Sequence, residues 1–262
     1  MITLMRDHAA EKPSAQAERF FIGTEGTHGR RDDMKHLIFD CGGVLVFPRL
    51  GDWFTPMGAA EILGERARDL CTAKYLQAHR ACADWLDETR LVGNVEEERV
   101  LRRQYIKALE TRMGWRMTLG EINRLADDFT DNARRYGLFD DVKTWLDRWK
   151  HDYSLGILSD AFPSILEFMK QYGIYDDFGK VVISTQVGAT KPDARMYAAI
   201  LDALDARPED CLFVDDRAAN LTGAVSAGMQ AVQMARSVFL PSELWDGPVV
   251  HNFAELDRLL KG

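Results

Sequence analysis

Cysteine is scarce in this 262-residue chain, and its few cysteines are far apart. The four, which are Cys41, Cys71, Cys82 and Cys211, include no Cys-x-x-Cys pair, the spacing that thiol redox sites and many zinc sites use. Two of them sit inside apolar, strand-like runs. We therefore interpret the cysteines as small core residues in a reducing compartment, and we expect a cytoplasmic location.

A basic excess is also missing. The chain has 33 lysines and arginines against 41 aspartates and glutamates, which gives a formal net charge of −8. A protein that binds along a phosphate backbone needs clustered positive charge, so we expect no nucleic-acid partner. A small anionic substrate would instead have to meet positive charge that is gathered locally.

Long apolar runs, internal repeats and low-complexity tracts are absent from the sequence as well. No apolar stretch approaches the ~20 residues that a membrane-spanning helix needs, so we expect no membrane partner. Residues 1–33 are polar and lack the apolar core of a secretory signal. We interpret them as an N-terminal extension ahead of the compact domain: a leader, a misassigned start or a loosely packed, flexible arm.

The composition suits one large α/β core and a smaller second unit, because 46% of the residues are hydrophobic. From residue 138 onward, short apolar runs alternate with amphipathic segments; the runs are Leu155–Leu158, Val181–Ile183, Cys211–Val214 and Ala231–Met234. Alternation of this kind predicts an α/β fold with a parallel sheet that helices cover on both faces. We place this core at residues 34–48 and 138–262.

Residues 49–137 are rich in Glu, Arg, Ala and Leu, and they predict an all-helical insert. Apolar residues at a helical period predict one helix over Glu65–Leu91 and a second over Val95–Met113. Thr118 and Glu121 have the spacing of a capping box, in which the threonine side chain accepts from the backbone and the glutamate reaches back. A third helix should therefore begin there.

Four short motifs stand at or just after the ends of predicted strands. The first, His36-Leu37-Ile38-Phe39-Asp40-Cys41-Gly42-Gly43-Val44-Leu45, delivers the carboxylate of Asp40 to a strand end, where two glycines let the backbone turn sharply. The others are Ser159 after its strand, Thr190-Lys191-Pro192-Asp193 in a loop, and the acidic pair Asp215-Asp216. In parallel sheets, ligands bind beyond the carboxyl ends of the strands, so these residues should face one site.

The acidic pair predicts a metal. Two adjacent carboxylates at a strand end repel each other unless a cation shares the field. Hard oxygen ligands suit Mg²⁺, so we interpret Asp40, Asp215 and Asp216 as a Mg²⁺ site. Taken alone, one of these aspartates could instead cap the helix that follows.

The order of the four motifs resembles the signature of the haloacid dehalogenase superfamily, which is an aspartate, a serine or threonine, a lysine and an acidic pair. The resemblance covers roughly residues 35–235. It implies a hydrolase with a Rossmann-like, doubly wound parallel sheet and an inserted helical cap, similar to the phosphatases of the superfamily. It also implies that Asp40 is the nucleophile and that Ser159, with the backbone of Asp160 and Ala161, donates to phosphate oxygens.

The same resemblance assigns the remaining site residues. Lys191 would bridge the nucleophile and the substrate phosphate as a point charge. The backbone carbonyl of Gly42 would complete the Mg²⁺ site, and Asn220 would orient the carboxylates of the acidic pair. The insert would close over the core and select the substrate, and Arg49 is our candidate for a substrate contact. Four further residues could face the same cleft: Asp52, Trp53, His79 and Arg80.

One position departs from the pattern of the superfamily. Its phosphatases usually carry a second aspartate two residues after the nucleophile as the general acid, and here that position is Gly42. General acid catalysis is typically worth about 10²–10⁴-fold, so poor leaving groups should react slowly. Anomeric and acyl phosphates should be affected less.

Together these residues predict a Mg²⁺-dependent phosphatase that acts on a small phosphorylated metabolite, such as a sugar phosphate, through an aspartyl-phosphate intermediate. A 2-haloacid dehalogenase is the first alternative, because a halide leaves without a proton. However, dehalogenases need no Mg²⁺, and the retained acidic pair argues against this alternative. The second alternative is a phosphate-binding regulator that kept the fold and lost turnover.

Overall fold

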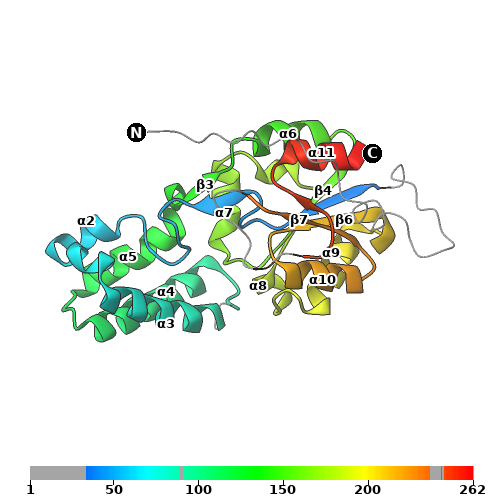
Figure 1. Cartoon of the computed structure of the whole chain (residues 1–262). Helices are drawn as coiled ribbons and strands as arrows, with labels where there is room; N and C mark the ends of the chain where they lie inside the picture. Colours follow the sequence, from blue (N-terminus) through cyan, green and yellow to red (C-terminus); the bar gives the residue numbers. More distant parts are fainter. Residues whose placement is uncertain (1–33, 89–90, 237–242, 244, 262) are drawn as a thin grey trace, which may run out of the picture.

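Six short strands form one parallel sheet in the computed structural model of the chain, which describes residues 34–88, 91–236, 243 and 245–261 (Figure 1). Their order across the sheet is β5-β4-β1-β6-β7-β8. The strands are β1 (His36–Phe39), β4 (Ser154–Ser159), β5 (Lys180–Ile183), β6 (Cys211–Asp215), β7 (Gln230–Met234) and β8 (Val249–Val250). The predicted parallel α/β sheet is therefore confirmed. The predicted extension at residues 1–33 lies outside the described residues.

Helices cover both faces of this sheet. Successive side chains of a strand point to opposite faces, so Leu37 and Phe39 lie in one hydrophobic cluster and Ile38 in another. The covering helices are α6 (Val142–Trp149), α7 (Ser164–Gln171), α9 (Ala194–Leu204), α10 (Ala218–Ser226) and α11 (Phe253–Lys261). Figure 1 shows α6 and α11 above the sheet and α9 and α10 below it. Shorter helices lie in the connections: η4 (Tyr175–Asp177), α8 (Ser184–Val187) and η5 (Pro208–Asp210).

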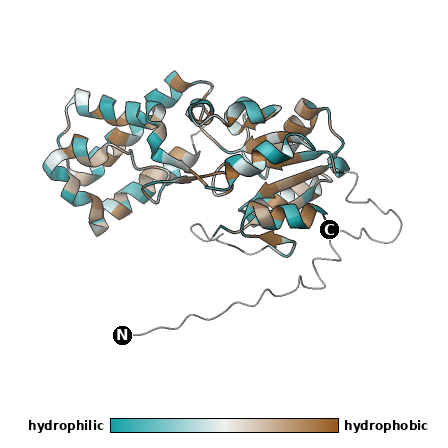
Figure 2. Cartoon of the chain, turned by 90° about the horizontal axis from the view of Figure 1, so that it is seen from above, coloured by the Kyte–Doolittle hydropathy of each residue, from teal (hydrophilic) through white to brown (hydrophobic). Residues whose placement is uncertain are grey.

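A second body of helices lies to the left of the sheet in Figure 1. It consists of α2 (Ala59–Leu63), η2 (Gly64–Cys71), α3 (Ala73–Glu88), α4 (Val95–Met113) and α5 (Leu119–Asp131), and we call residues 59–131 the helical insert. The insert buries its own hydrophobic cluster, which includes Tyr105 and Phe129. Figure 2 shows its helices alternating between hydrophilic and hydrophobic residues, as amphipathic helices do. The predicted fold class, a parallel sheet with an inserted all-helical unit, is confirmed.

The prediction of a single helix over Glu65–Leu91 is wrong. The structure divides this segment into η2 and α3 at Thr72, whose backbone is extended. The Thr72 hydroxyl accepts from the amide of Tyr75, so the threonine begins a new helix instead of continuing the old one. The buried face differs too, because Leu76 is 60% exposed and Tyr75 is buried.

The next two helices of the insert agree with the sequence. Helix α4 has the predicted bounds. At the start of α5, the Thr118 hydroxyl accepts from the Glu121 amide and the Glu121 carboxylate accepts from the Thr118 amide, so the capping box is confirmed. Local sequence determines these two helix starts, and tertiary packing is not needed to explain them.

A short antiparallel ribbon joins the insert to the core. Its strands are β2 (Val46–Pro48) and β3 (Tyr136–Leu138), and the turn η3 (Ala133–Arg135) precedes β3. This ribbon was not predicted from the sequence. Gly137 lies opposite Phe47, whose ring occupies the space that a side chain at position 137 would take. The predicted division into core and insert has its boundaries at residue 49, directly after β2, and at residue 137, within β3, and it stays a prediction.

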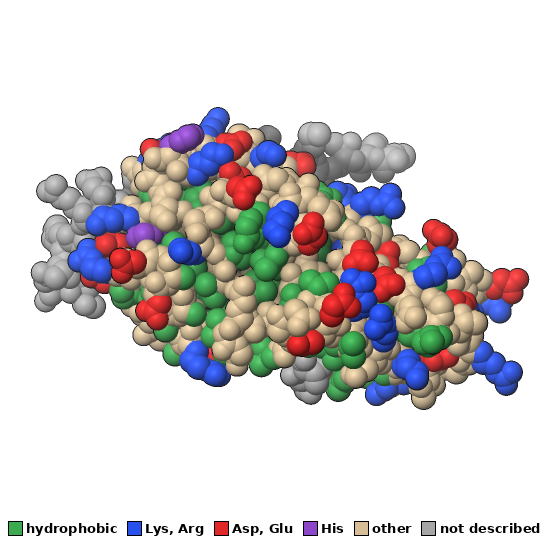
Figure 3. Space-filling view, turned by 180° about the vertical axis from the view of Figure 1, so that it is seen from behind, with side chains coloured by type: hydrophobic (Ala, Val, Ile, Leu, Met, Phe, Trp, Pro, Cys, Tyr) green, Lys and Arg blue, Asp and Glu red, His purple; other side chains and the backbone are tan. Residues whose placement is uncertain are grey.

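The surface matches the charge and composition of the sequence. On the face seen in Figure 3, acidic and basic side chains are intermingled, so this face carries no continuous basic stripe. Within the described ranges, none of the helices combines the length and the apolar composition that crossing a bilayer requires.

Gly223 in α10 provides a test of the core packing. Alanine in a helix is ordinarily more favourable than glycine by about 1 kcal/mol. At position 223, however, a Cβ would lie 2.5 Å from the hydroxyl of the fully buried Tyr197 and 2.8 Å from its ring carbons. We therefore expect Gly223→Ala to lower the free energy of unfolding by about 1–3 kcal/mol, measured by urea denaturation.

The matched control is Gly120→Ala in α5. The nearest atom to an added Cβ there is 3.9 Å away, so we expect stabilisation by about 0.5–1 kcal/mol. A Gly223→Ala protein that gained stability like the control would contradict the close packing of Tyr197 on α10.

Candidate active site

Three neighbouring strands end at one edge of the sheet, and each delivers a polar side chain there. Strand β1 pairs in parallel with β4 on one side and with β6 on the other. Asp40 directly follows β1, Ser159 ends β4 and Asp215 ends β6. Because the carboxyl ends of parallel strands coincide, the three side chains meet, as the sequence predicted.

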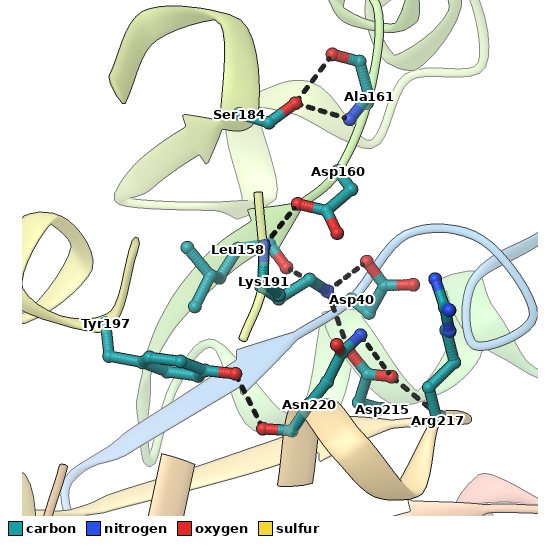
Figure 4. Close-up of polar contacts among 10 residues, drawn as sticks. All are labelled: Asp40, Leu158, Asp160, Ala161, Ser184, Lys191, Tyr197, Asp215, Arg217 and Asn220. Carbon is teal, nitrogen blue, oxygen red and sulfur yellow. Dashed lines mark hydrogen bonds and ion pairs between the residues drawn. The ribbon is translucent and has the colours of Figure 1, made fainter. Parts of the chain in front are cut away.

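Lys191 lies at the centre of this group (Figure 4). Its Nζ donates to Asp40 Oδ1 at 2.7 Å, to Asp215 Oδ2 at 2.7 Å and to the Leu158 carbonyl at 3.0 Å. These three acceptors use all three N–H bonds of the ammonium. Burial lowers the pKa of Lys191. Attraction by the carboxylates of Asp215 and Asp40 has the larger combined effect, so the pKa of Lys191 is raised. The lysine is therefore a fixed positive charge between two strand ends.

Asp215 is fully engaged by the protein. Besides Lys191, its two oxygens accept from Asn220 Nδ2 at 3.0 and 3.1 Å, and Oδ1 accepts from the Arg217 amide at 2.8 Å. Asn220 is itself held in place, because the Tyr197 hydroxyl donates to its carbonyl at 2.7 Å. Asn220 thus has the position that its predicted orienting role requires.

Asp216 completes a cluster of three carboxylates. One oxygen each from Asp40, Asp215 and Asp216 lie within 4.8 Å of one another. Desolvation, and then repulsion by Asp40 and Asp215, raise the pKa of Asp216 to about 8. Gly43 makes room for this side chain, because its φ is +74° and a Cβ would lie 2.7 Å from Asp216 Oδ2. A divalent cation would relieve the repulsion, so the cluster has the chemistry of a metal site.

Asp40 combines burial with a balanced charge environment. It is 8% exposed. Desolvation raises its pKa most, the ammonium of Lys191 lowers it and Asp215 raises it, with a result of about 6. A hydrogen bond with Ser159 also favours the ionised form. Above this pH the carboxylate predominates, which is the form that can attack an electrophile.

The loop after β4 carries the predicted phosphate donors. Asp160 Oδ1 accepts from the Lys191 amide at 2.9 Å, so this side chain fixes the loop that carries the lysine. The Ala161 amide donates to Ser184 Oγ at 3.2 Å. A phosphate oxygen would therefore have to displace Ser184 before it could bond to Ala161.

A cavity of about 240 Å³ adjoins the carboxylate cluster. The predicted site residues that line it are Asp40, Gly42, Ser159, Asp160, Lys191, Asp216 and Asn220. Other lining residues are Arg102 of the insert, Trp53, Phe54 and Arg135 of the segments that join it to the core, and Phe162 of the core loop after β4. The cavity thus has a charged side formed by the sheet and a side that is aromatic and basic.

The ring of Trp53 lies beside Gly42. A Cβ at position 42 would meet two carbons of this ring at 3.3 and 3.4 Å. The φ of Gly42 is not positive, so the backbone itself would accept another residue. An indole therefore lies in the direction in which an aspartate at position 42 would extend.

Two buried charged residues of α4 were not predicted from the sequence as site residues, and one of them, Arg102, lines the cavity. Glu98 and Arg102 are 0% and 1% exposed. Glu98 accepts from the Ser164 amide at 2.9 Å and from the Ser164 hydroxyl at 3.0 Å, at the first turn of α7. A signal was present, because Glu98 and Arg102 fall on the same helical face as the buried Leu101 and Tyr105.

The structure does not bring Arg49 to the cavity. Arg49 is exposed, and its Nε donates to the Tyr136 carbonyl at 3.0 Å, so it supports the β2-β3 ribbon. Asp52 contacts His79 at 3.3 Å, and neither residue lines the cavity. Arg80 is exposed on α3. Of the five candidates near the insert, Trp53 alone lies where the sequence placed it.

A family model for haloacid dehalogenase-like hydrolases matches residues 34–228. The chain belongs to this family. A phosphoserine phosphatase from Thermus thermophilus is 30% identical over 183 residues, which are 68% of this chain and 68% of that protein. A glyceraldehyde 3-phosphate phosphatase from Methanopyrus kandleri is 32% identical over 93 residues, 35% of this chain and 40% of that protein. This member of the haloacid dehalogenase superfamily is therefore a hydrolase.

Solved structures share the fold of this hydrolase. L-2-haloacid dehalogenase from Xanthobacter autotrophicus is 18% identical with a TM-score of 0.62, over 87% of this chain and 99% of that chain. A superfamily hydrolase from Bacillus subtilis, solved with magnesium bound, is 13% identical with a TM-score of 0.64 over the same shares of the two chains, 87% and 99%. At these identities the likeness shows the fold alone.

Lys191→Met tests the central charge of this haloacid dehalogenase-like site. Without the ammonium, the pKa of the buried Asp40 rises further above its unfolded value. The folded state then binds more protons than the unfolded state, so stability falls as pH rises through the folded pKa. We expect a loss of about 3–5 kcal/mol in the free energy of unfolding near pH 8 and a smaller loss near pH 5.

Urea denaturation in a chelator measures both values. Lys180→Met, which replaces an exposed lysine of the same sheet, is the control and should change stability little at either pH. An equal loss for Lys191→Met at both pH values would show that its charge does not hold the carboxylates.

Proposed function

We propose that this hydrolase is a Mg²⁺-dependent phosphatase that uses Asp40 as a nucleophile toward a small phosphorylated substrate. One observation carries the proposal. Lys191 pairs with Asp40 and Asp215, whereas Asp216 beside them has no ion pair among the described residues. A nucleophile next to an uncompensated carboxylate suits a site that is completed by a divalent cation.

The residues present fit a Mg²⁺ ion. Asp40 and Asp216, with the carbonyl of Gly42, would hold it, because the oxygens of Asp215 already accept four hydrogen bonds. Asp215 would orient Lys191 instead of binding the metal, which narrows the predicted ligand set. Bound Mg²⁺ would supply positive charge to the phosphoryl oxygens.

Two displacements would complete the reaction. An oxygen of Asp40 forms a bond to phosphorus while the bond from phosphorus to the ester oxygen breaks, and the leaving oxygen takes a proton from solvent water. Water then attacks phosphorus, the aspartyl–phosphate bond breaks, and the carboxylate and inorganic phosphate are released. Lys191 holds the orientation of Asp40 in both steps, since it bonds to Oδ1.

The names of the relatives support a small phosphorylated substrate. The Thermus thermophilus protein is named for phosphoserine and the Methanopyrus kandleri protein for glyceraldehyde 3-phosphate. Both compounds are short phosphate monoesters, and the cavity of about 240 Å³ suits molecules of that kind.

A 2-haloacid dehalogenase is the second candidate, and one observation favours it. The indole of Trp53 places aromatic surface beside the nucleophile, as a carbon–halogen substrate would need. Asp216 argues against this reading, because displacement of halide by a carboxylate requires no divalent cation. Release of halide from a 2-haloacid without Mg²⁺ would favour the dehalogenase over the phosphatase.

Asp40 and Mg²⁺ provide the direct test. We expect the wild-type protein to hydrolyse 4-nitrophenyl phosphate with Mg²⁺ and not in a chelator. Asp40→Asn should lower kcat by about 10³-fold or more, because an amide is a poor nucleophile. The wild-type rate with a chelator and no added metal is the control for the role of the ion.

Asp216→Asn and Asp215→Asn form a matched pair for the metal assignment. Asp216→Asn should weaken Mg²⁺ binding by at least about tenfold in calorimetry and should not lower the free energy of unfolding, since it removes like-charge repulsion. Asp215→Asn should lower that free energy, because it breaks the buried pair with Lys191. Unchanged Mg²⁺ affinity in the Asp216→Asn protein would contradict the ligand set.

Gly42 allows a test of the missing general acid. Without that acid, rates should depend steeply on the pKa of the leaving group, with phenolic and acyl phosphates ahead of alkyl phosphates. Gly42→Asp should raise rates for alkyl phosphates by about 10–100-fold and flatten this dependence, once the ring of Trp53 shifts by a few tenths of an ångström. Gly42→Asn has the same shape without the acid and should not do so. Equal slopes for wild type and Gly42→Asp would mean that a proton donor already exists.

A further inference from the structure

Arg102 is a buried guanidinium at the edge of the active-site cavity. It belongs to α4 of the helical insert, is 1% exposed and lines the cavity. Its Cζ lies 4.3 Å from the ring centre of Phe129 in the insert and 4.0 Å from that of Phe162 in the core. Both rings lie against the guanidinium, whose N–H groups donate hydrogen bonds along its edge.

One part of that edge has no partner. Arg102 Nε and Nη2 donate to Glu98 Oε1 at 3.4 and 3.2 Å. Nη1 is buried and has no hydrogen-bond partner among the described residues. A buried N–H group of a charged side chain without an acceptor is strongly unfavourable, so an acceptor that enters the cavity would satisfy it.

The charges around Arg102 also leave a positive excess. Glu98 is the carboxylate of this region, and its oxygens are shared with the amide and hydroxyl of Ser164. Arg135, 5% exposed, is the second guanidinium; it donates to the carbonyls of Phe129 and Trp53 and has no ion pair among the described residues. This side of the cavity therefore has two buried guanidinium groups and one carboxylate, which leaves an excess of one positive charge.

The metal and phosphate side of the cavity does not account for this excess. There, Lys191 pairs with Asp40 and Asp215, and the remaining carboxylate of Asp216 calls for a cation. The aromatic residues Trp53, Phe54 and Phe162 also line the cavity, and they suit a short carbon skeleton. A ligand with a phosphate at one end and a second anion at the other would match both charge clusters.

We propose that Arg102 determines specificity by binding a carboxylate of the substrate through Nη1, so that the substrate class is a short phosphorylated carboxylic acid. This proposal rests on the proposed phosphatase function, because it assigns the far end of the same substrate. A carboxylate is a compact organic anion, and one of its oxygens can accept from a single free guanidinium nitrogen in a cavity of about 240 Å³.

Non-hydrolysable phosphonates test the assignment without turnover. Calorimetry with Mg²⁺ present compares 3-carboxypropylphosphonate with its carboxamide, which has the same shape and lacks the second charge. We expect the wild-type protein to bind the carboxylate about 10–100-fold more tightly than the amide. In a Glu98→Gln/Arg102→Gln protein, which leaves no unpaired buried charge at this pair, we expect that ratio to fall below about threefold.

Two single variants are matched controls. Glu98→Gln removes the competing carboxylate and keeps the guanidinium, so the preference for the carboxylate should persist or increase. Arg112→Gln, at an exposed arginine near the end of the same helix, should keep the wild-type ratio.

Three results would overturn the proposal. The first is a wild-type ratio near one, which needs no variant and is decisive even if the double variant does not fold. The second is an equal loss of affinity for both phosphonates in the double variant, because Arg102 would then serve the phosphate or the fold. The third is tighter binding of propane-1,3-bisphosphonate than of the carboxylate, which would replace the carboxylate with a second phosphate.

A separate measurement tests the phosphatase function. Its readout is Mg²⁺-dependent hydrolysis of 4-nitrophenyl phosphate, which carries no carboxylate. A protein that selects the carboxyphosphonate and hydrolyses no ester would contradict the phosphatase function and support the assignment of Arg102.

Discussion

One buried ammonium holds the active-site edge of the sheet together. Lys191 bonds to Asp40 and Asp215 at 2.7 Å each; Asp40 directly follows β1, and Asp215 ends the neighbouring strand β6. Without this charge, two carboxylates would face each other in surroundings where repulsion is strong. Asn220 and Tyr197 support the arrangement from α10 and α9, because Tyr197 fixes Asn220 and Asn220 fixes Asp215. The site is therefore part of the core, and its geometry depends on core packing.

This arrangement places the adjacent carboxylates of Asp215 and Asp216 in different surroundings. Asp215 faces the lysine and is saturated by donors, whereas Asp216 stays beside Asp40 with its pKa raised to about 8. Two residues that are adjacent in sequence thus differ because one ends a strand and points inward, and the next begins a turn. The turn at Gly43 is close enough to Asp216 that a larger residue would not fit.

The sheet and the central site residues could be predicted because their signals are local. Asp40 and Asp215 follow apolar runs that form strands. Because the carboxyl ends of parallel strands lie at the same edge of the sheet, strand pairing alone brings these two residues together. Arg102 could not be found in this way, since its role depends on rings from Phe129 and Phe162, which lie in different bodies of the fold. The position of Arg49 could not be predicted for a related reason. Its side chain donates to the carbonyl of Tyr136, and this contact exists only because β2 pairs with β3, which is far away in the sequence.

Glu98 connects the two bodies through one carboxylate. It accepts from Ser164 in the core and from Arg102 in the insert, so each side supplies donors to the same oxygens. Because Glu98 and Arg102 both belong to α4, a shift of the insert relative to the sheet would break the bonds from Ser164 to Glu98 and leave the pair of Glu98 with Arg102 in place. The carboxylate that pairs with Arg102 is therefore also the one that joins the insert to the first turn of α7, so a substitution at Glu98 would change the ion pair and the contact between the two bodies together.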